Sequence, residues 1–335
     1  MREFRAPIFS LIPPRPKSDS LVPHYTSTSR ALAFLLILAF LLAGCQRPPE
    51  YRRVTLSSSA KGLPTHNNRD PEKPPFRLAI SSVVSPKETI RSYQALITYL
   101  SQKLGRPVEL VQRGTYAETN DLLQSGNVDL AMVCTYAYIL GHREFGMELL
   151  AVPKVAGKAV YESNIIVSAD SNLKDFRDLR GKVFAFTDPI SFSGTLYPTY
   201  LLSKMGETRE SFFQRYIFTY SHDNSIKAVG EKLVHAAAVD SLILDYALAK
   251  NPAYRNKIRV IGSSPSVGSP PVVVNPNLDK TLKDKLQAIL LEMHNDPQGQ
   301  EALREIMVDR FALPDDRAYD FIRQIEKATK WEKRG

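Results

Sequence analysis

The sequence predicts an α/β protein made of two lobes, and two observations lead to this prediction. Short apolar strands and amphipathic helices alternate from Phe76 onward, and such alternation builds a sheet with helices on its faces. The alternation also comes in two successive sets, and 335 residues leave room for one large domain or for two lobes. Because open α/β sheets bind ligands at the ends of their strands, we expect a ligand cleft between the lobes.

The first residues carry an export signal. Arg30 precedes an apolar run over residues 31–44, ALAFLLILAFLLAG. This run is shorter than the roughly 20 residues of a membrane-spanning helix, and it has the length of a signal-peptide core. The run ends in Leu-Ala-Gly-Cys45, which resembles a bacterial lipobox, whose cysteine is acylated and becomes the first mature residue. We expect residues 1–45 to be a lipoprotein signal peptide. The alternative is an uncleaved anchor helix, and either one exports the rest of the chain.

Residues 46–75 predict a disordered tether between the lipid and the folded body. They are rich in Pro, Ser, Asn and charged residues and show almost no apolar periodicity. Gln46 stands directly after the cysteine, and the lack of an aspartate there favours the outer membrane in a cell that has one.

The distribution of charge argues against a nucleic-acid partner. The net charge is +9, of which residues 1–45, 46–75 and 76–335 each supply +3. Two thirds of the excess therefore lies outside the predicted body, which has no basic block and no zinc-finger spacing.

The first set of elements begins at Phe76. Strands are expected at residues 76–83, 107–113, 128–134 and 148–155, with helices at 87–105, 115–126 and 135–146 between them. In the first of these helices apolar residues recur at helical spacing, and Gly105 supplies the stop.

The second set begins at Glu162. It comprises a strand at 162–169, the segment 175–187, a helix after Gly194, the segments 212–221, 224–234 and 236–248, and a strand at 257–264. From Asp279 onward the chain is helical and amphipathic. We expect residues 76–166 and 262–335 to form lobe 1 and residues 167–261 to form lobe 2.

Only two cysteines are present, Cys45 and Cys134, so a lipidated Cys45 leaves no intramolecular disulfide. Cys134 lies in the apolar segment DLAMVC. A small buried side chain is the favoured interpretation there, and a reactive thiol is the alternative.

Small hydroxyls and a glycine gather where a predicted strand passes into a helix, in the run Ser191-Phe192-Ser193-Gly194. Helix N-termini leave backbone N–H groups unpaired, so such a junction can hold an anion without any arginine or lysine. The alternative is an ordinary helix cap.

Four segments, taken in order and spacing, carry a family resemblance: GTYAETNDLLQSGNVDLAMVCTYAYI, YESNIIVSADSNLKDFRDLRGKVFAFTDPISFSG, YSHDNSIKAVGEKLVHAAAVDS and SSPSVGSPPVVV. The chain resembles the phosphate/phosphite/phosphonate-binding (PhnD-like) substrate-binding lipoproteins of ABC transporters. The resemblance implies a type 2 periplasmic-binding-protein fold and the capture of phosphate, phosphite or an alkylphosphonate outside the cytoplasm for an ABC permease. It implies no cofactor, no metal, no catalysis and a monomer.

The resemblance also implies a ligand-binding set, which is Tyr116, Tyr161, Ser191, Phe192, Ser193, Gly194 and His222. Asp240, two residues before Leu242, could partly replace a carboxylate that the family carries nearby, or could accept from a protonated ligand oxygen. Family members read Ser-Thr-Ser-Gly in the oxyanion loop. Phe192 stands here in place of the threonine, so the loop has one hydroxyl fewer but the same number of backbone N–H groups. Where aminoalkylphosphonate binders carry a carboxylate for the ligand amine, this chain has Leu242 and Pro270, which disfavours such ligands. His235 stands where the family usually has an aspartate.

His222 is expected to donate to the anion in its protonated form. With an ordinary pKa near 6.5 that a bound anion raises, affinity is expected to weaken above about pH 7.

Two alternatives to import remain open. Ser193, His222 and Asp240 could form a hydrolase triad, although the sequence lacks the Gly-x-Ser-x-Gly of a nucleophile elbow. A family-like lipoprotein could also present its oxyanion to a membrane histidine kinase as a sensor, and the sequence does not separate import from sensing.

Overall fold

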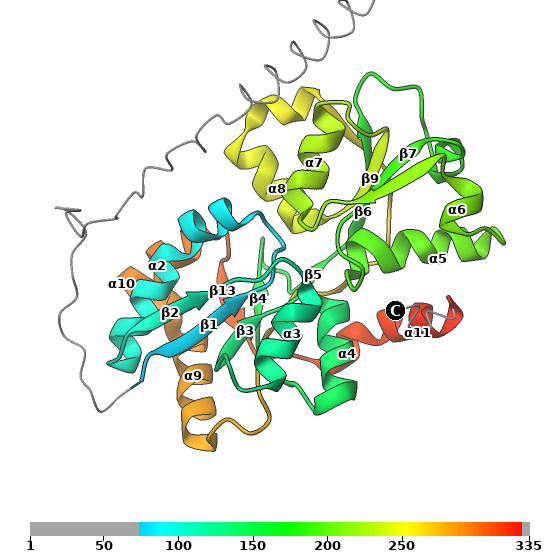
Figure 1. Cartoon of the computed structure of the whole chain (residues 1–335). Helices are drawn as coiled ribbons and strands as arrows, with labels where there is room; N and C mark the ends of the chain where they lie inside the picture. Colours follow the sequence, from blue (N-terminus) through cyan, green and yellow to red (C-terminus); the bar gives the residue numbers. More distant parts are fainter. Residues whose placement is uncertain (1–73, 330–335) are drawn as a thin grey trace, which may run out of the picture. The chain divides into compact units, whose positions relative to one another are not determined.

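The computed structural model describes residues 74–329 (Figure 1). The predicted signal peptide, Cys45 and all but the last two residues of the predicted tether lie outside the described residues, so these remain predictions. Within the described part, no helix is both long and apolar enough to cross a membrane.

Lobe 1 is built on a six-stranded sheet. Its strands run in the spatial order β13 (Arg310–Ala312), β4 (Glu148–Lys154), β12 (Val272–Val274), β3 (Leu130–Met132), β1 (Phe76–Ile80) and β2 (Val108–Val111). β1 lies between β2 and β3 and is parallel to both, whereas β12 is antiparallel to β3 and β4. The carboxyl ends of β1 and β3 therefore lie at the same edge of the sheet.

Five α-helices accompany this sheet: α2 (Pro86–Leu104), α3 (Tyr116–Gln124), α4 (Thr135–Phe145), α9 (Lys280–Glu292) and α10 (Pro297–Glu305). The first of them shows how local sequence sets the ends of a helix. Pro86 occupies the first turn of α2, where no intrahelical donor is needed, and Gly105 ends the helix with φ of 66°.

Lobe 2 is built on a five-stranded sheet, in the order β10 (Ile258–Ser263), β6 (Ser163–Ser168), β9 (Ala236–Asp240), β7 (Val183–Phe186) and β8 (Arg215–Phe218). Its α-helices are α5 (Tyr197–Lys204), α6 (Arg209–Phe212), α7 (His222–Gly230) and α8 (Ser241–Lys250). Short helical turns occur in both lobes, at η1 (Phe176–Leu179), η2 (Phe192–Leu196), η3 (Pro252–Asn256), η4 (Met293–Asn295) and η5 (Asp316–Tyr319).

The chain passes between the lobes at β5 (Val160–Tyr161) and β11 (Val267–Gly268), which pair with each other in antiparallel register. The lobe boundaries expected at 166/167 and 261/262 fall inside β6 and β10, because both strands pair within the second sheet over their whole lengths. A continuous apolar run such as ESNIIVSA holds no signal for the point at which the chain changes sheets.

One hydrophobic cluster contains residues from both lobes. It includes Tyr136 and Tyr138 of α4, Phe192 and Leu196 of η2, and Ile322 of the last helix, α11 (Asp320–Ala328). The other large clusters lie within single lobes.

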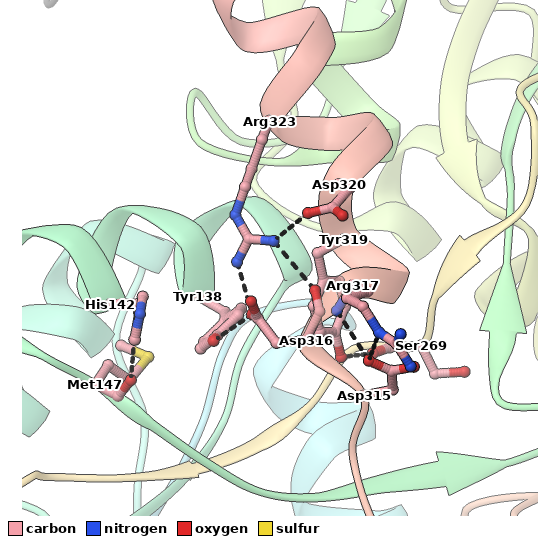
Figure 2. Close-up of polar contacts among 10 residues, drawn as sticks. All are labelled: Tyr138, His142, Met147, Ser269, Asp315, Asp316, Arg317, Tyr319, Asp320 and Arg323. Atoms are coloured by element: carbon pink, nitrogen blue, oxygen red, sulfur yellow. Dashed lines mark hydrogen bonds and ion pairs between the residues drawn. The ribbon is translucent and has the colours of Figure 1, made fainter.

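Polar contacts hold the C-terminal segment in place (Figure 2). The Tyr138 hydroxyl donates to Asp316 Oδ1 at 2.7 Å, and the Arg323 guanidinium donates to the same oxygen at 2.6 Å and to Asp320 Oδ1 at 2.9 Å. The Tyr319 hydroxyl donates to the Ser269 carbonyl at 2.9 Å. The entrance to α11 is therefore bound both to α4 and to the chain crossing at β11.

Candidate functional site

The hydroxyl-rich run forms a wide helical turn. Residues 192–196 are a π-helix that continues into α5, with the Leu196 N–H donating to the Ser191 carbonyl at 2.9 Å. The Ser191 hydroxyl caps the turn by accepting the Gly194 N–H at 3.0 Å. Since this amide already has a partner inside the turn, it is not free to bind an anion as the sequence predicted. π-Helical turns are rare and are often found at functional sites.

Gly194 is required by packing. A Cβ atom at this position would lie 2.4 Å from the Thr187 side chain, closer than any real Cβ contact. The glycine therefore lets the turn approach the end of β7.

Two hydroxyls of the turn, Ser193 Oγ and Thr195 Oγ1, are buried and have no hydrogen-bond partner. The Ser193 carbonyl accepts the Ser163 hydroxyl at 2.6 Å, which fixes the turn against β6. Buried hydroxyls without partners are costly, so each of them calls for an explanation. The two are two residues apart on a helical turn and do not face the same side, so a single guest can meet only one of them there.

His222 is the first residue of α7 and presents one nitrogen to the same region. Its Nδ1 lies 3.2 Å from the Asp240 backbone N–H, which donates to it, and 3.1 Å from the Thr187 hydroxyl. An accepting Nδ1 places the proton of the neutral ring on Nε2, which is buried and has no partner. Burial lowers the pKa of His222 to about 3. The expectation of a protonated imidazole therefore does not hold, and His222 offers one N–H while neutral.

Tyr116 approaches from lobe 1. It is the first residue of α3, after a capping box formed by Thr115 and Glu118. Its N–H donates to Asp188 Oδ2 of lobe 2 at 3.0 Å, and its buried hydroxyl has no partner. Burial raises the pKa of Tyr116 well above its usual value, so the phenol keeps its proton and can donate it.

The rings of Tyr161 and Phe192 contact each other, and the two residues differ in what else they contact. The Tyr161 hydroxyl is 2.6 Å from Thr135 Oγ1, so it already has a partner. Its ring meets Phe192 edge to face at 5.9 Å between centroids. Phe192 packs into the cluster shared by both lobes, so this apolar residue contributes to the core at the loop position.

Asp240 ends β9 and caps α8. Its Oδ1 accepts the N–H groups of Leu242 at 2.7 Å and Ile243 at 3.3 Å. Burial raises the pKa of Asp240 to about 7 despite these two bonds. The carboxyl can therefore be protonated near neutral pH, when it can also donate.

Hydrogen bonds and packing contacts connect the eight predicted positions. Two further residues, Cys134 and Thr187, belong to the same set of contacts. The Cys134 thiol is buried, donates to Ser191 Oγ at 3.9 Å and packs against Tyr116, and burial raises the pKa of the thiol. The sequence analysis missed Thr187, Asp188 and Thr195, and the only signal for the first two was their place after a predicted strand.

The hydrogen bonds of a hydrolase triad are not formed. The Asp240 carboxylate bonds to the start of α8, whereas His222 Nδ1 accepts from the Asp240 backbone. Ser193 Oγ and His222 Nε2 are both without partners, so they do not bond to each other.

Hydrogen bonds join the two lobes around the site. The His222 N–H donates to the Val83 carbonyl at 2.9 Å, and the Ser85 N–H donates to Asp223 Oδ1 at 2.9 Å. Further out, the Tyr246 hydroxyl donates to Glu88 Oε1 at 2.6 Å. The structure is therefore a closed form.

A cavity of about 110 Å³ lies between the lobes. Asp240, Leu242 and Pro270 all line it, so the two positions without the carboxylates expected of aminoalkylphosphonate binders both border this cavity.

Comparison with known proteins identifies relatives of one kind. The family model described as ABC transporter, phosphonate, periplasmic substrate-binding protein matches residues 78–319. A phosphate-import protein, PhnD, of Mycolicibacterium smegmatis is 28% identical over 276 residues, which are 79% of this chain and 81% of that protein. A phosphonates-binding periplasmic protein of Escherichia coli is 25% identical over 255 residues, 75% of each chain.

Solved structures agree on the fold. A binding protein component of an ABC phosphonate transporter from Pseudomonas aeruginosa superposes with a TM-score of 0.73 at 24% identity, covering 77% of this chain and 87% of that one. PhnD1 of Prochlorococcus marinus, in complex with methylphosphonate, gives 0.69 at 17% identity, covering 76% and 98%. The predicted two-lobed type 2 periplasmic-binding-protein fold is confirmed.

Proposed function

The chain belongs to the family of periplasmic substrate-binding proteins of phosphonate ABC transporters, and we propose that its site captures a phosphorus oxyanion for an ABC importer. The relatives are named for import and binding, which favours delivery to a permease over signalling to a histidine kinase. As in those relatives, the proposed role is binding without catalysis.

One observation carries the proposal, which is a set of buried polar atoms without partners. Tyr116 Oη, Ser193 Oγ and His222 Nε2 belong to the start of α3, to η2 and to the start of α7, which hydrogen bonds to Thr187 and Asp188 connect. Each of the three can donate a hydrogen bond. A tetrahedral oxyanion presents three or four acceptor oxygens, so it matches what these atoms lack.

Such a site can bind an anion without a positively charged side chain. A hydrogen bond to a charged group contributes about 1.5–3 kcal/mol. Hydrogen bonds of this kind, together with the dipole at the start of the helix, can therefore hold an anion without any arginine or lysine.

The proposed ligands are phosphate, phosphite and alkylphosphonates. Ligands that carry an ammonium group are disfavoured, because Leu242 and Pro270 offer no negative partner. Asp240 in its protonated form donates to the anion. In its charged form it repels a fully ionised anion and accepts only from a ligand oxygen that still carries a proton.

The proposal also covers the oligomeric state of the protein and its attachment to the membrane. The protein works as a monomer without cofactor or metal, held to the membrane by a lipid on Cys45 and a tether over residues 46–75. Mass spectrometry of the mature protein should then find an acylated Cys45 at the N-terminus, and Cys45→Ala should abolish the acylation; a mature N-terminus without lipid would contradict the anchor.

The test is calorimetric titration of the purified protein with phosphate, phosphite, methylphosphonate, 2-aminoethylphosphonate, sulfate and arsenate. At least one phosphorus oxyanion is expected to bind with a micromolar Kd or tighter, and Ser193→Ala to weaken it about tenfold or more. Ser203→Ala is the control, because that exposed hydroxyl donates only to the Tyr200 carbonyl. Absence of binding by all phosphorus oxyanions would reject the proposal.

A further inference from the structure

We propose that Ser163 is a positioning residue for the oxyanion site, and that its contacts with Ser264 connect the π-turn to the two chain crossings between the lobes. This inference rests on the proposed function, and it names a residue that acts through Ser193 instead of binding the ligand itself.

The carbonyl of Ser193 has no donor within its own turn. In a π-helix each N–H donates to the carbonyl five residues before it, and the Tyr197 N–H bonds to the Phe192 carbonyl in this way. The next donor in the series would belong to Pro198, and proline has no N–H. The sequence therefore leaves the Ser193 carbonyl to find a partner outside the turn.

Ser163 supplies that partner. Its hydroxyl donates to the Ser193 carbonyl at 2.6 Å, and both residues are 0% exposed, so loss of this bond would leave a buried carbonyl unpaired. The carbonyl carbon and the side chain of Ser193 are attached to the same Cα atom. The bond that fixes the carbonyl therefore also fixes where the Ser193 hydroxyl lies, and this hydroxyl is one of the donors proposed for the anion.

Ser163 lies where the chain enters lobe 2, and Ser264 lies where it leaves. Ser163 is the first residue of β6 and follows β5 by two residues, whereas Ser264 comes directly after β10 and precedes β11. The Ser264 N–H donates to the Ser163 carbonyl at 2.9 Å, and the Ser163 N–H donates to Ser264 Oγ at 2.9 Å. The Ser264 hydroxyl in turn donates to the Pro265 carbonyl at 2.8 Å. The position of Ser163 therefore depends on both crossings.

The register of β6 places Ser163 beside a second part of the site. Ser163 pairs with Asp240 of β9, whose N–H donates to His222 Nδ1 at 3.2 Å. Ser163 thus borders both parts of lobe 2 that supply donors, the π-turn and the start of α7. Because lobe closure bends the chain at its crossings, a shift of Ser163 there changes the position of the π-turn relative to His222.

The test is a double-mutant cycle of Ser163→Ala and Ser193→Ala, in which the purified proteins are titrated with inorganic phosphate, phosphite and methylphosphonate. Ser163→Ala should weaken Kd about fivefold when Ser193 is present and less than about twofold in the Ser193→Ala background, because a hydroxyl that is absent cannot be misplaced. A residue that only stabilises the fold would lower the unfolding temperature and leave Kd unchanged in both backgrounds.

Ser168→Ala is the matched control, because Ser168 belongs to the same strand and its exposed hydroxyl donates to Asp170 Oδ1 at 2.7 Å. Its Kd should equal that of the unmodified protein.

Ser264→Ala tests the connection to the crossings. It should weaken Kd about threefold alone and add nothing in the Ser163→Ala background, since Ser264 acts through Ser163. Additive effects of these two substitutions would reject the connection. If Ser163→Ala does not fold, Ser264→Ala enters the cycle with Ser193→Ala in its place.

The outcomes separate the two proposals. If a phosphorus oxyanion binds and Ser163→Ala leaves Kd unchanged, or weakens it equally with and without the Ser193 hydroxyl, positioning by Ser163 is rejected and oxyanion capture stands. If no phosphorus oxyanion binds, the function itself fails and this inference falls with it.

Discussion

At the scale of single residues, the oxyanion site depends on Gly194, because its missing side chain brings the π-turn against Thr187. Gly194→Ala is expected to lower the free energy of unfolding by about 1–3 kcal/mol through overpacking and to weaken oxyanion binding by moving Ser193. Thermal unfolding and titration of the variant measure both effects.

Gly262→Ala is the matched control, because a Cβ there meets nothing within 4 Å. An unchanged Kd in Gly194→Ala would mean that the close approach to Thr187 does not position the hydroxyls.

The pH response of binding is expected to come from Asp240. Its raised pKa means that the carboxyl is protonated below about pH 7 and charged above it, where it repels the anion. Affinity should therefore fall about tenfold between pH 6 and pH 8 relative to Asp240→Asn, measured with the same ligand so that the titration of the ligand cancels. Asn keeps a side-chain oxygen for the cap of α8.

His222 should add no pH dependence over this range, because its lowered pKa keeps the ring neutral. A Kd that responds equally to pH in the wild type and in Asp240→Asn would assign the effect to another group. The sequence also predicted that affinity weakens above about pH 7. It assigned this effect to His222, whereas the structure favours Asp240.

The residues proposed for the site could be selected from the sequence, whereas the hydrogen bonds among them could not. Ser191, Ser193 and Gly194 could be singled out because small residues cluster at one junction. The protonation state of His222 could not, because it depends on the Asp240 amide, which lies eighteen residues away along the chain and comes close only in the fold.

At the scale of elements, one arginine, Arg323, stabilises the position of the C-terminal helix α11. Arg323 joins Asp316 and Asp320 with its side chain 26% exposed, whereas Arg317 pairs with Asp315 while 85% exposed (Figure 2). Arg323→Ala should lower the free energy of unfolding by about 1–2 kcal/mol, and Arg317→Ala by less than about 0.5 kcal/mol. Chemical denaturation compares the two, and equal losses would show that burial of the pair does not matter.

The elements themselves could largely be predicted from periodicity and caps. Gly105 ends α2 where it was expected, and the hydrophobic spacing of that helix matches its buried face. The π-turn before α5 could not be predicted, since it depends on contacts of Gly194 and Ser193 with β7 and β6.

At the scale of the whole molecule, the site is complete only when the lobes meet. Tyr246 of lobe 2 bonds to Glu88 of lobe 1 at 2.6 Å, so Tyr246→Phe should weaken ligand binding about fivefold to tenfold by destabilising the closed form. Titration and the rate of ligand dissociation measure this, with most of the change in dissociation.

Tyr216→Phe is the matched control, because its hydroxyl donates to Glu210 within lobe 2. If Tyr246→Phe and Tyr216→Phe bind the ligand with equal affinity, the Tyr246 hydroxyl does not stabilise the closed form.

The burial of the polar site has one more consequence. Tyr116, Ser193 and His222 are all 0% exposed, so a guest bound to them loses its water on that side while the halves stay together. Its bonds to both halves slow their separation, so the release rate depends on how often the halves part. Release of the ligand at the membrane would then be controlled by the partner that separates the two lobes.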